Sequence, residues 1–217
     1  MSTRTTLIVL AIIFVIFAAL GAYAYPRLPE WVASHWNAAG QVDGYSSRTS
    51  GLLLLPLMVL GITVLLLFLP EIDPLKANIA LFRRDYNSIV VLTAVFMLYL
   101  YLLNLLQNLG LRFNMVQWMM PAFGVLFYAI GGLLGKAKRN FFIGIRTPWT
   151  LSSDFVWQQT HRRGALLFKI AGVVILVGML LPQYTIWIML GACMVAALYT
   201  IVYSYWLFQR EARQSTQ

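Results

Sequence analysis

The 217-residue sequence has few charged residues and only one cysteine, and each shortage excludes a class of protein. Charged residues make up 11% of the chain, whereas a soluble domain has about 25%. So few charges cannot cover a water-exposed surface, and 60% of the residues are hydrophobic. We therefore expect an integral membrane protein. The single Cys193 excludes a disulfide framework and a thiolate metal site.

Six apolar segments approach the length that crosses a membrane, which is about 20 residues. They cover residues 6–25, 52–69, 88–109, 116–135, 165–182 and 184–207. None alternates polar and apolar residues as a barrel strand does, so we expect an all-α protein with six transmembrane helices. Ala22-Tyr23-Ala24 resembles a signal-peptide cleavage site. The apolar run before it is longer than a signal core of about 7–15 residues, which favours a permanent anchor.

The placement of basic residues predicts the orientation, because lysine and arginine in short loops stay in the cytoplasm. With the N-terminus inside, all but Arg27, Arg48 and Arg112 of the 16 lysines and arginines lie in cytoplasmic segments. Both termini are therefore expected inside the cell. This topology accounts for the net charge of +9, and we expect no direct contact with nucleic acid.

The middle of each predicted span lacks ionisable side chains. Ion-coupled transport usually needs such groups, so this absence weakens the hypothesis of a transporter. Asn104 and Asn108 share one face of the third span and predict an interhelical hydrogen bond. Gly131, Gly132 and Gly135 predict close helix packing in the fourth span, and the small-residue spacing is only a weak sign of a dimer.

The first outer loop, residues 26–51, has apolar residues at helical spacing. Leu28, Trp31, Val32, His35 and Trp36 lie at i, i+3, i+4, i+7 and i+8, which predicts an amphipathic helix on the outer membrane surface. His35 and Asp43 are the candidate metal or acid–base residues of this loop. One histidine is too few for a zinc site, which takes three or four ligands, so we favour a polar or partner-binding role and expect no metal.

The second cytoplasmic loop, residues 136–164, starts with Lys136, Lys138 and Arg139, which would attract anionic lipid. The apolar run that follows should lie against the membrane. Ser152 or Ser153 is a credible helix N-cap, with an acidic residue in the first turn. This predicts a short interfacial helix before the fifth span. Arg146 is a candidate clamp for a carboxylate, a phosphate or helix carbonyl groups.

The stretch NFFIGIRTPWTLSSDFVWQQTHRRG at 140–164 resembles the signature of the SdpI family of bacterial membrane proteins, which is named for an immunity protein against a secreted cannibalism toxin. The outer stretch LPEWVASHWNAAGQVDGYSSR is similar to the DUF1648-like domain that precedes this signature in longer members. The resemblance divides the chain into two regions. Residues 1–70 form a helical hairpin with the outer loop, and residues 71–217 form a four-helix region with the signature loop.

The resemblance implies a non-enzymatic protein of the bacterial plasma membrane, without cofactor, metal or catalytic residues. It implies protection from a toxic peptide outside and recruitment of a transcriptional repressor inside, with membrane lipids as further partners. The oligomeric state stays open. The outer residues implied in toxin or partner binding are His35, Trp36, Asn37, Gly40, Asp43 and Tyr45. The cytoplasmic signature residues are Asn140, Phe142, Gly144, Arg146, Thr147, Pro148, Trp149, Trp157 and His161.

Two other functions remain alternatives. One is a transporter or flippase for a peptide or a lipid. The other is a membrane enzyme that uses His35 and Asp43 in the outer loop, or His161 and Arg146 inside. Neither histidine has a recognisable nucleophile beside it in the sequence, which is why we favour the immunity function.

Overall fold

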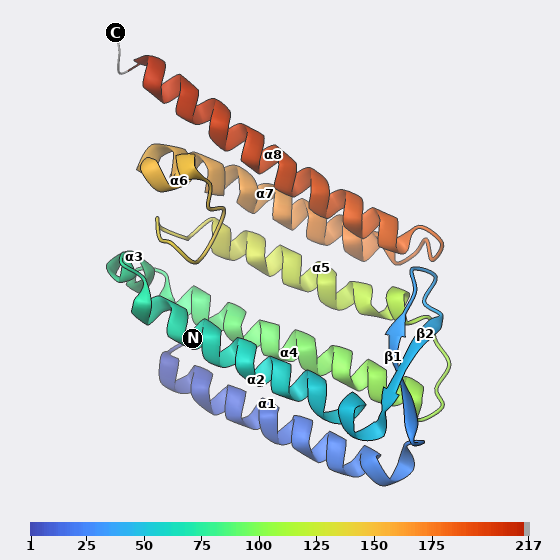
Figure 1. Cartoon of the computed structure of the whole chain (residues 1–217). Helices are drawn as coiled ribbons and strands as arrows, with labels where there is room; N and C mark the ends of the chain where they lie inside the picture. Colours follow the sequence, from blue (N-terminus) through green and yellow to red (C-terminus); the bar gives the residue numbers. More distant parts are fainter. Residues whose placement is uncertain (215–217) are drawn as a thin grey trace.

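The computed structural model describes residues 1–214 as a bundle of long helices (Figure 1). The long helices are α1 (Thr3–Ala24), α2 (Arg48–Ile72), α4 (Arg83–Asn108), α5 (Met115–Leu134), α7 (Asp154–Gly178) and α8 (Thr185–Gln214). Helix α4 packs against α1, α2 and α5, and α7 packs against α5 and α8. The bundle therefore has two halves, α1–α2–α4 and α5–α7–α8, which meet where α4 contacts α5.

Short elements close the two ends of the bundle. The 3-10 helix η1 (Tyr25–Arg27) and the strands β1 (Trp31–Trp36) and β2 (Val42–Ser47) lie at one end, and the helices α3 (Lys76–Ala80) and α6 (Pro148–Ser152) lie at the other (Figure 1). The N-terminus and the end of α8 also lie on the side of α3 and α6. We call the strand-bearing end the hairpin end and the opposite one the signature end.

Within residues 1–214, five helices are long and apolar enough to cross a membrane. They cover Thr3–Arg27, Arg48–Ile72, Arg83–Asn108, Met115–Leu134 and Thr185–Gln214. Helix α7 has 25 residues, but Arg162, Arg163 and Lys169 lie in the part that ends at residue 169. Its uncharged part, residues 170–178, is shorter than the roughly 20 residues that a crossing needs. Five of the six predicted spans are thus supported by length and composition.

The outer loop is not helical, and the prediction of an all-α fold is wrong at this point. Strands β1 and β2 form a two-stranded antiparallel sheet, in which Val32 lies opposite Ser46 and Ala33 opposite Tyr45. The apolar spacing in this loop fits a helix and a strand about equally over so few residues. Tryptophan and valine favour strands, and a turn at residues 37–41 allows the two strands to pair.

A separate interfacial helix before the fifth span is likewise absent, since α7 runs without a break from Asp154 to Gly178. The predicted start is confirmed: Ser153 is the N-cap, its side chain accepts a hydrogen bond from the Val156 backbone N–H, and Asp154 lies in the first turn. The charged part of α7 stays in the bundle, because Arg163 lies over the Tyr203 ring of α8 and Ala165 and Lys169 lie beside Gly131 of α5.

Glycines allow α5 and α7 to approach closely. A Cβ atom on Gly131 would lie 2.7 Å from the carbonyl oxygen of Ala165, and one on Gly172 would lie 2.6 Å from the carbonyl oxygen of Gly124. The predicted close packing at Gly131 is therefore confirmed, and it occurs within one chain. Gly132 faces open space.

Candidate functional site

The hairpin is held on the end of α4 by two asparagine side chains. The Asn108 carboxamide oxygen accepts a hydrogen bond from the Ala33 backbone N–H at 2.7 Å, and its Nδ2 donates to the Ala33 carbonyl at 3.1 Å. Asn104 Nδ2 donates to the same carbonyl at 3.2 Å. The Asn108 amide thus pairs with β1 as a neighbouring strand would. The predicted interhelical bond is wrong, because these asparagines bind a strand.

The turn of the hairpin rests on the start of α5. Asn37 Oδ1 accepts from the backbone N–H groups of Ala39 and Gln41, each at 3.0 Å, which closes the turn. Asn114 Nδ2 donates to the Ala39 carbonyl at 2.9 Å. Gly40 has φ +77°, and a Cβ atom there would lie within 2.3 Å of Asn114 Oδ1. Gly40 therefore permits both the left-handed turn and the approach of Asn114.

His35 and Asp43 face each other across the two strands. His35 Nδ1 lies 2.5 Å from Asp43 Oδ1, and the two side chains are 72% and 43% exposed. A pair so open to water contributes little to stability. Gly44 stands opposite His35, where a Cβ atom would lie 2.9 Å from the histidine Cβ. Among residues 1–214, no three His, Cys, Asp or Glu side chains gather into a metal-binding group.

A cavity of about 780 Å³ lies under the hairpin, between β1 and the helices α2, α4 and α5. His35, Trp36 and Asn37 line it from the hairpin. Its floor is mostly apolar and includes Leu54, Met58, Leu100, Met115, Val116 and Met119. Cavities of this size and character commonly hold small organic groups or large side chains.

Polar residues also line the cavity. The Asn104 side chain lines the cavity. The indole N–H of Trp36 is buried and has no hydrogen-bond partner among the residues that the structure describes. Of the other predicted outer residues, Gly40 shapes the turn, Asp43 pairs with His35, and Tyr45 is 65% exposed on β2. Of the six predicted outer residues, three therefore line the cavity, and the other three shape or cover the hairpin.

At the signature end, Asn140 organises its own loop. Its side chain is completely buried. Its Nδ2 donates to the carbonyls of Lys138 and Ile143, and its Oδ1 accepts from the backbone N–H groups of Phe142 and Ile143. All four bonding positions of the carboxamide are used. Asn140 is thus a structural residue, with no free group for a ligand.

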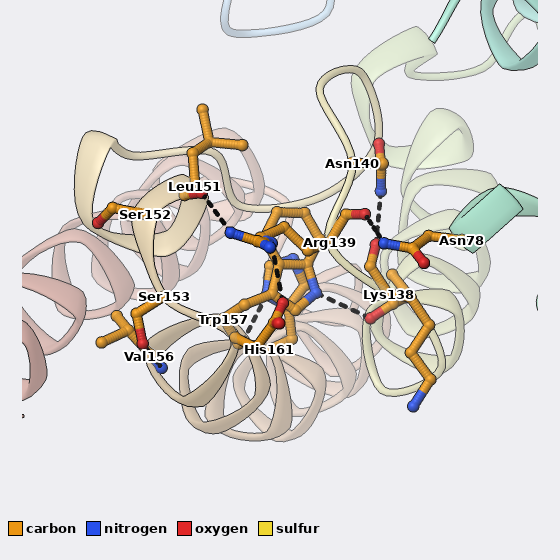
Figure 2. Close-up of polar contacts among 12 residues, drawn as sticks. Asn78, Lys138, Arg139, Asn140, Leu151, Ser152, Ser153, Val156, Trp157 and His161 are labelled. Atoms are coloured by element: carbon orange, nitrogen blue, oxygen red, sulfur yellow. Dashed lines mark hydrogen bonds and ion pairs between the residues drawn. The ribbon is translucent and has the colours of Figure 1, made fainter. Parts of the chain in front are cut away.

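Sequence reasoning missed Asp73, which ties this loop to the end of α2. Its buried carboxylate accepts from the Phe141 backbone N–H at 2.8 Å and from the Leu75 backbone N–H at 2.7 Å. Asn78 Nδ2 adds a bond to the Arg139 carbonyl at 2.8 Å (Figure 2). The sequence did contain a signal for this role. Asp73 precedes Pro74, and an aspartate before proline commonly accepts hydrogen bonds from backbone N–H groups in a turn.

His161 is buried between the signature loop and Trp157 (Figure 2). Its Nε2 accepts from the Ile145 backbone N–H at 3.0 Å, so Nδ1 carries the proton and donates to the Trp157 carbonyl at 2.8 Å. The two rings stack with centroids 4.0 Å apart. Burial lowers the pKa of His161 to about 4, and the Trp157 carbonyl opposes that shift. The ring is neutral at physiological pH, and both of its nitrogens are occupied by the backbone.

Other signature residues join the loop to α6 and α8. Thr147 and Thr150 form a capping box at the start of α6, and the Thr147 hydroxyl lies 3.2 Å from that of Ser204 on α8. The Trp149 ring packs against Tyr205 with centroids 5.0 Å apart. These contacts cross from the signature to the last helix, which explains why a threonine and a tryptophan stand here.

Few of the nine predicted signature residues are exposed. Arg146 is exposed, and its guanidinium donates to the Phe141 carbonyl at 2.8 Å. Pro148 is also exposed, whereas Phe142 is half-buried and packs on the core. We call the exposed residues Phe141, Arg146 and Pro148 the signature face. They leave a basic and apolar surface at this end of the bundle.

Comparison with known proteins places these regions in families. Residues 136–204 match the SdpI/YfhL protein family, and residues 12–60 match a domain of unknown function, DUF1648. The chain is 26% identical over 187 residues to the immunity protein SdpI of Bacillus subtilis (strain 168), covering 86% of this chain and 87% of that protein. No solved structure matches the chain. The chain is therefore a multi-pass membrane protein that resembles the SdpI/YfhL family over residues 136–204 and the DUF1648 domain over residues 12–60, as its sequence predicted.

Proposed function

We propose that this protein protects the bacterial membrane from a secreted antimicrobial peptide, which it binds in the cavity under the hairpin. The observation that carries the proposal is that cavity, because His35, Trp36 and Asn37 of the predicted outer site line it together. The relative from Bacillus subtilis is an immunity protein, and the alignment covers 86% of this chain, including the hairpin. A non-enzymatic protective role agrees with both observations.

The cavity suits an apolar side chain of a peptide that enters the membrane surface. Its methionine-rich floor adapts to different apolar shapes. The unpartnered indole N–H of Trp36 and the amide of Asn104 supply the few polar contacts that orient a ligand. Burying an apolar side chain there stabilises the complex by about 2 kcal/mol. The remaining free energy of binding would have to come from further contacts with the exposed residues of strand β2.

The proposed orientation places the hairpin outside the cell and the signature inside. The N-terminus and the end of α8 lie on the signature side, which supports an even number of crossings. We take α7 as the sixth span, since the turn at residues 179–184 reverses the chain and α7 packs along α8. The Lys169 Nζ lies 5.8 Å from the centroid of the Tyr128 ring, and this contact keeps the positive charge against the bundle.

A second part of the proposal is that the signature face recruits a cytoplasmic repressor. Phe141 is 44% exposed beside the exposed Arg146, a combination of apolar and basic groups that favours protein contacts. Helix α4 connects the two ends, because Asn108 binds the hairpin and Asp85 binds Lys136 at 2.5 Å at the start of the signature loop. Peptide binding outside would then bias contacts inside through one helix.

Protection is tested by producing the chain in a strain that the family's secreted peptide kills, and counting survivors after challenge. The proposal expects survival that depends on the intact cavity. Equal killing with and without stably inserted protein would contradict it. Recruitment is tested separately, by following a fluorescent repressor at the membrane with Arg146 intact or replaced by alanine.

A further inference from the structure

A second cavity, of about 330 Å³, lies at the signature end, where α5 ends and α7 begins. Three basic residues at the start of the loop line it: Lys136, Lys138 and Arg139. Asn78 and Gln158 add amide groups, and Asp154 is the carboxylate in the lining that the structure describes. Positive groups therefore outnumber negative ones around this space.

The ion pairs leave part of that charge available. Lys136 Nζ is paired with Asp85 at 2.5 Å, and Arg139 Nε lies 2.8 Å from Asp154 Oδ1. Lys138 is exposed and forms no ion pair within residues 1–214. Figure 2 shows its side chain extending away from the guanidinium of Arg139. Lys138 is free to turn toward a ligand.

Arg139 also has a donor whose hydrogen bond is poorly formed. Its Nη1 donates to the Leu151 carbonyl at 3.0 Å, which fixes the guanidinium between α6 and α7 (Figure 2). Its Nε is buried and, despite the nearby Asp154, has no hydrogen bond of good geometry in the described part of the chain. The Asp154 carboxylate is 2.8 Å away but poorly aligned, so this buried guanidinium N–H gains free energy from an acceptor that approaches it in better geometry.

The rim of the cavity is apolar. Leu81 lines it and is 72% exposed, and the neighbouring loop residue Phe141 is 44% exposed. Leucine and phenylalanine side chains at the end of a membrane bundle are covered by lipid in preference to water. A ligand that fits both features has an anionic group and an apolar body.

We propose that this cavity binds the phosphate of an anionic phospholipid, with Lys138 and Arg139 contacting the headgroup and Leu81 contacting an acyl chain. Phosphate oxygens accept strong charge-assisted hydrogen bonds from ammonium and guanidinium groups. This site lies at the opposite end of the bundle from the peptide cavity, and its lining shares no residue with that cavity. The inference does not depend on the proposed function.

Native mass spectrometry of the purified full-length chain tests this site. Retention of phosphatidylglycerol is compared with that of phosphatidylcholine, and inorganic phosphate at millimolar concentration serves as a competitor. The variants are Lys138→Gln, which removes one charge at an exposed side chain, and Lys138→Arg, which keeps it. Arg162→Gln is the matched control, because Arg162 is an exposed basic residue of α7 outside the cavity lining.

We expect phosphatidylglycerol to bind in preference to phosphatidylcholine and Lys138→Gln to weaken its binding about fivefold, the effect of one basic residue near an anionic surface. Lys138→Arg should restore the affinity, and Arg162→Gln should leave it unchanged. Equal losses in Lys138→Gln and Arg162→Gln would show diffuse attraction and overturn the site. No preference for phosphatidylglycerol would overturn it too. Displacement of the lipid by inorganic phosphate would reject a lipid source and assign the cavity to free phosphate.

Discussion

Gly144 lies so close to His161 that a side chain at position 144 would collide with the histidine ring. A Cβ atom on Gly144 would lie 2.4 Å from His161 Nε2, and the glycine has φ +115°. The next residue, Ile145, donates its backbone N–H to that nitrogen. The signature glycine and the signature histidine thus form one structural unit, which fixes the path of the loop between α5 and α6.

Replacing Gly144 with alanine should therefore destabilise the fold. The added methyl group meets His161, and the left-handed backbone is strained for any other residue, so we expect a loss of about 2 kcal/mol in the free energy of unfolding. Thermal unfolding in detergent measures it. The matched control is Gly132→Ala, which faces open space on α5 and should be neutral or slightly stabilising. Equal stability of both variants would contradict this view of the loop.

His161 should make the stability depend on pH. Its pKa in the folded chain is about 4, lower than the 6.5 of an exposed histidine. The unfolded chain therefore binds the extra proton first, and the stabilisation is complete above pH 6.5 and lost as the pH falls toward 4. The loss is at most about 3 kcal/mol. Comparison of melting temperatures from pH 7.5 to 4.5 with His161→Gln checks this. An unchanged slope in the variant would show that other groups cause the effect.

Asn108 should hold the hairpin on the bundle. Asn108→Ala removes the bonds to both backbone groups of Ala33 and leaves its N–H unsatisfied, while Asn104 still bonds the carbonyl, so we expect local stability to fall by about 1–3 kcal/mol. Hydrogen exchange at residues 31–47 should become faster by one to two orders of magnitude, while α7 stays protected. Gln107→Ala is the control, since Gln107 bonds to Phe113 and not to the hairpin. Unaltered exchange in the hairpin would refute the role of Asn108.

Variants at Arg146 and Trp149 should distinguish an effect on recruitment from an effect on folding. Arg146 is exposed with one bond to the Phe141 carbonyl, so Arg146→Ala should cost less than about 1 kcal/mol but abolish recruitment of a repressor. Trp149→Ala removes packing against Tyr205 and should lower the melting temperature as well. Arg112→Ala at the hairpin end is the control for both. Membrane localisation of the repressor and thermal unfolding are measured together, and full recruitment by a stable Arg146→Ala variant would reject the signature face.

The sequence predicts the long helices well, because long apolar runs have few alternatives in a membrane. It predicts the Ser153 cap for a local reason, since a serine before an acidic first turn satisfies the free N–H groups of a helix. The residues of the hairpin were misassigned because only six residues carry the pattern, and the pairing partner lies beyond the turn. The secondary structure of so short a segment is decided by the residues with which it pairs, and these are distant in sequence.

The sequence singled out residues of the outer loop together, and their role in binding a peptide stays a prediction. His35, Trp36 and Asn37 were expected together and do line one cavity, but its floor comes from α2, α4 and α5, which no local pattern joins. Asn140 and His161 were singled out by the family resemblance without a stated contact, and the structure buries them within the loop. Residues typical of a family can be retained for packing as well as for contact, and only burial distinguishes the two.

The most direct test of the central claim is the affinity of the purified protein for the secreted peptide when the hairpin cavity is filled. Met119→Trp adds bulk to the cavity lining, and Leu198→Trp adds the same bulk on α8, where the side chain is 54% exposed and outside the lining. We predict that Met119→Trp weakens peptide binding at least tenfold and removes protection, and that Leu198→Trp matches the unchanged protein. Undiminished binding and survival with a folded Met119→Trp variant would contradict the claim that this cavity receives the peptide.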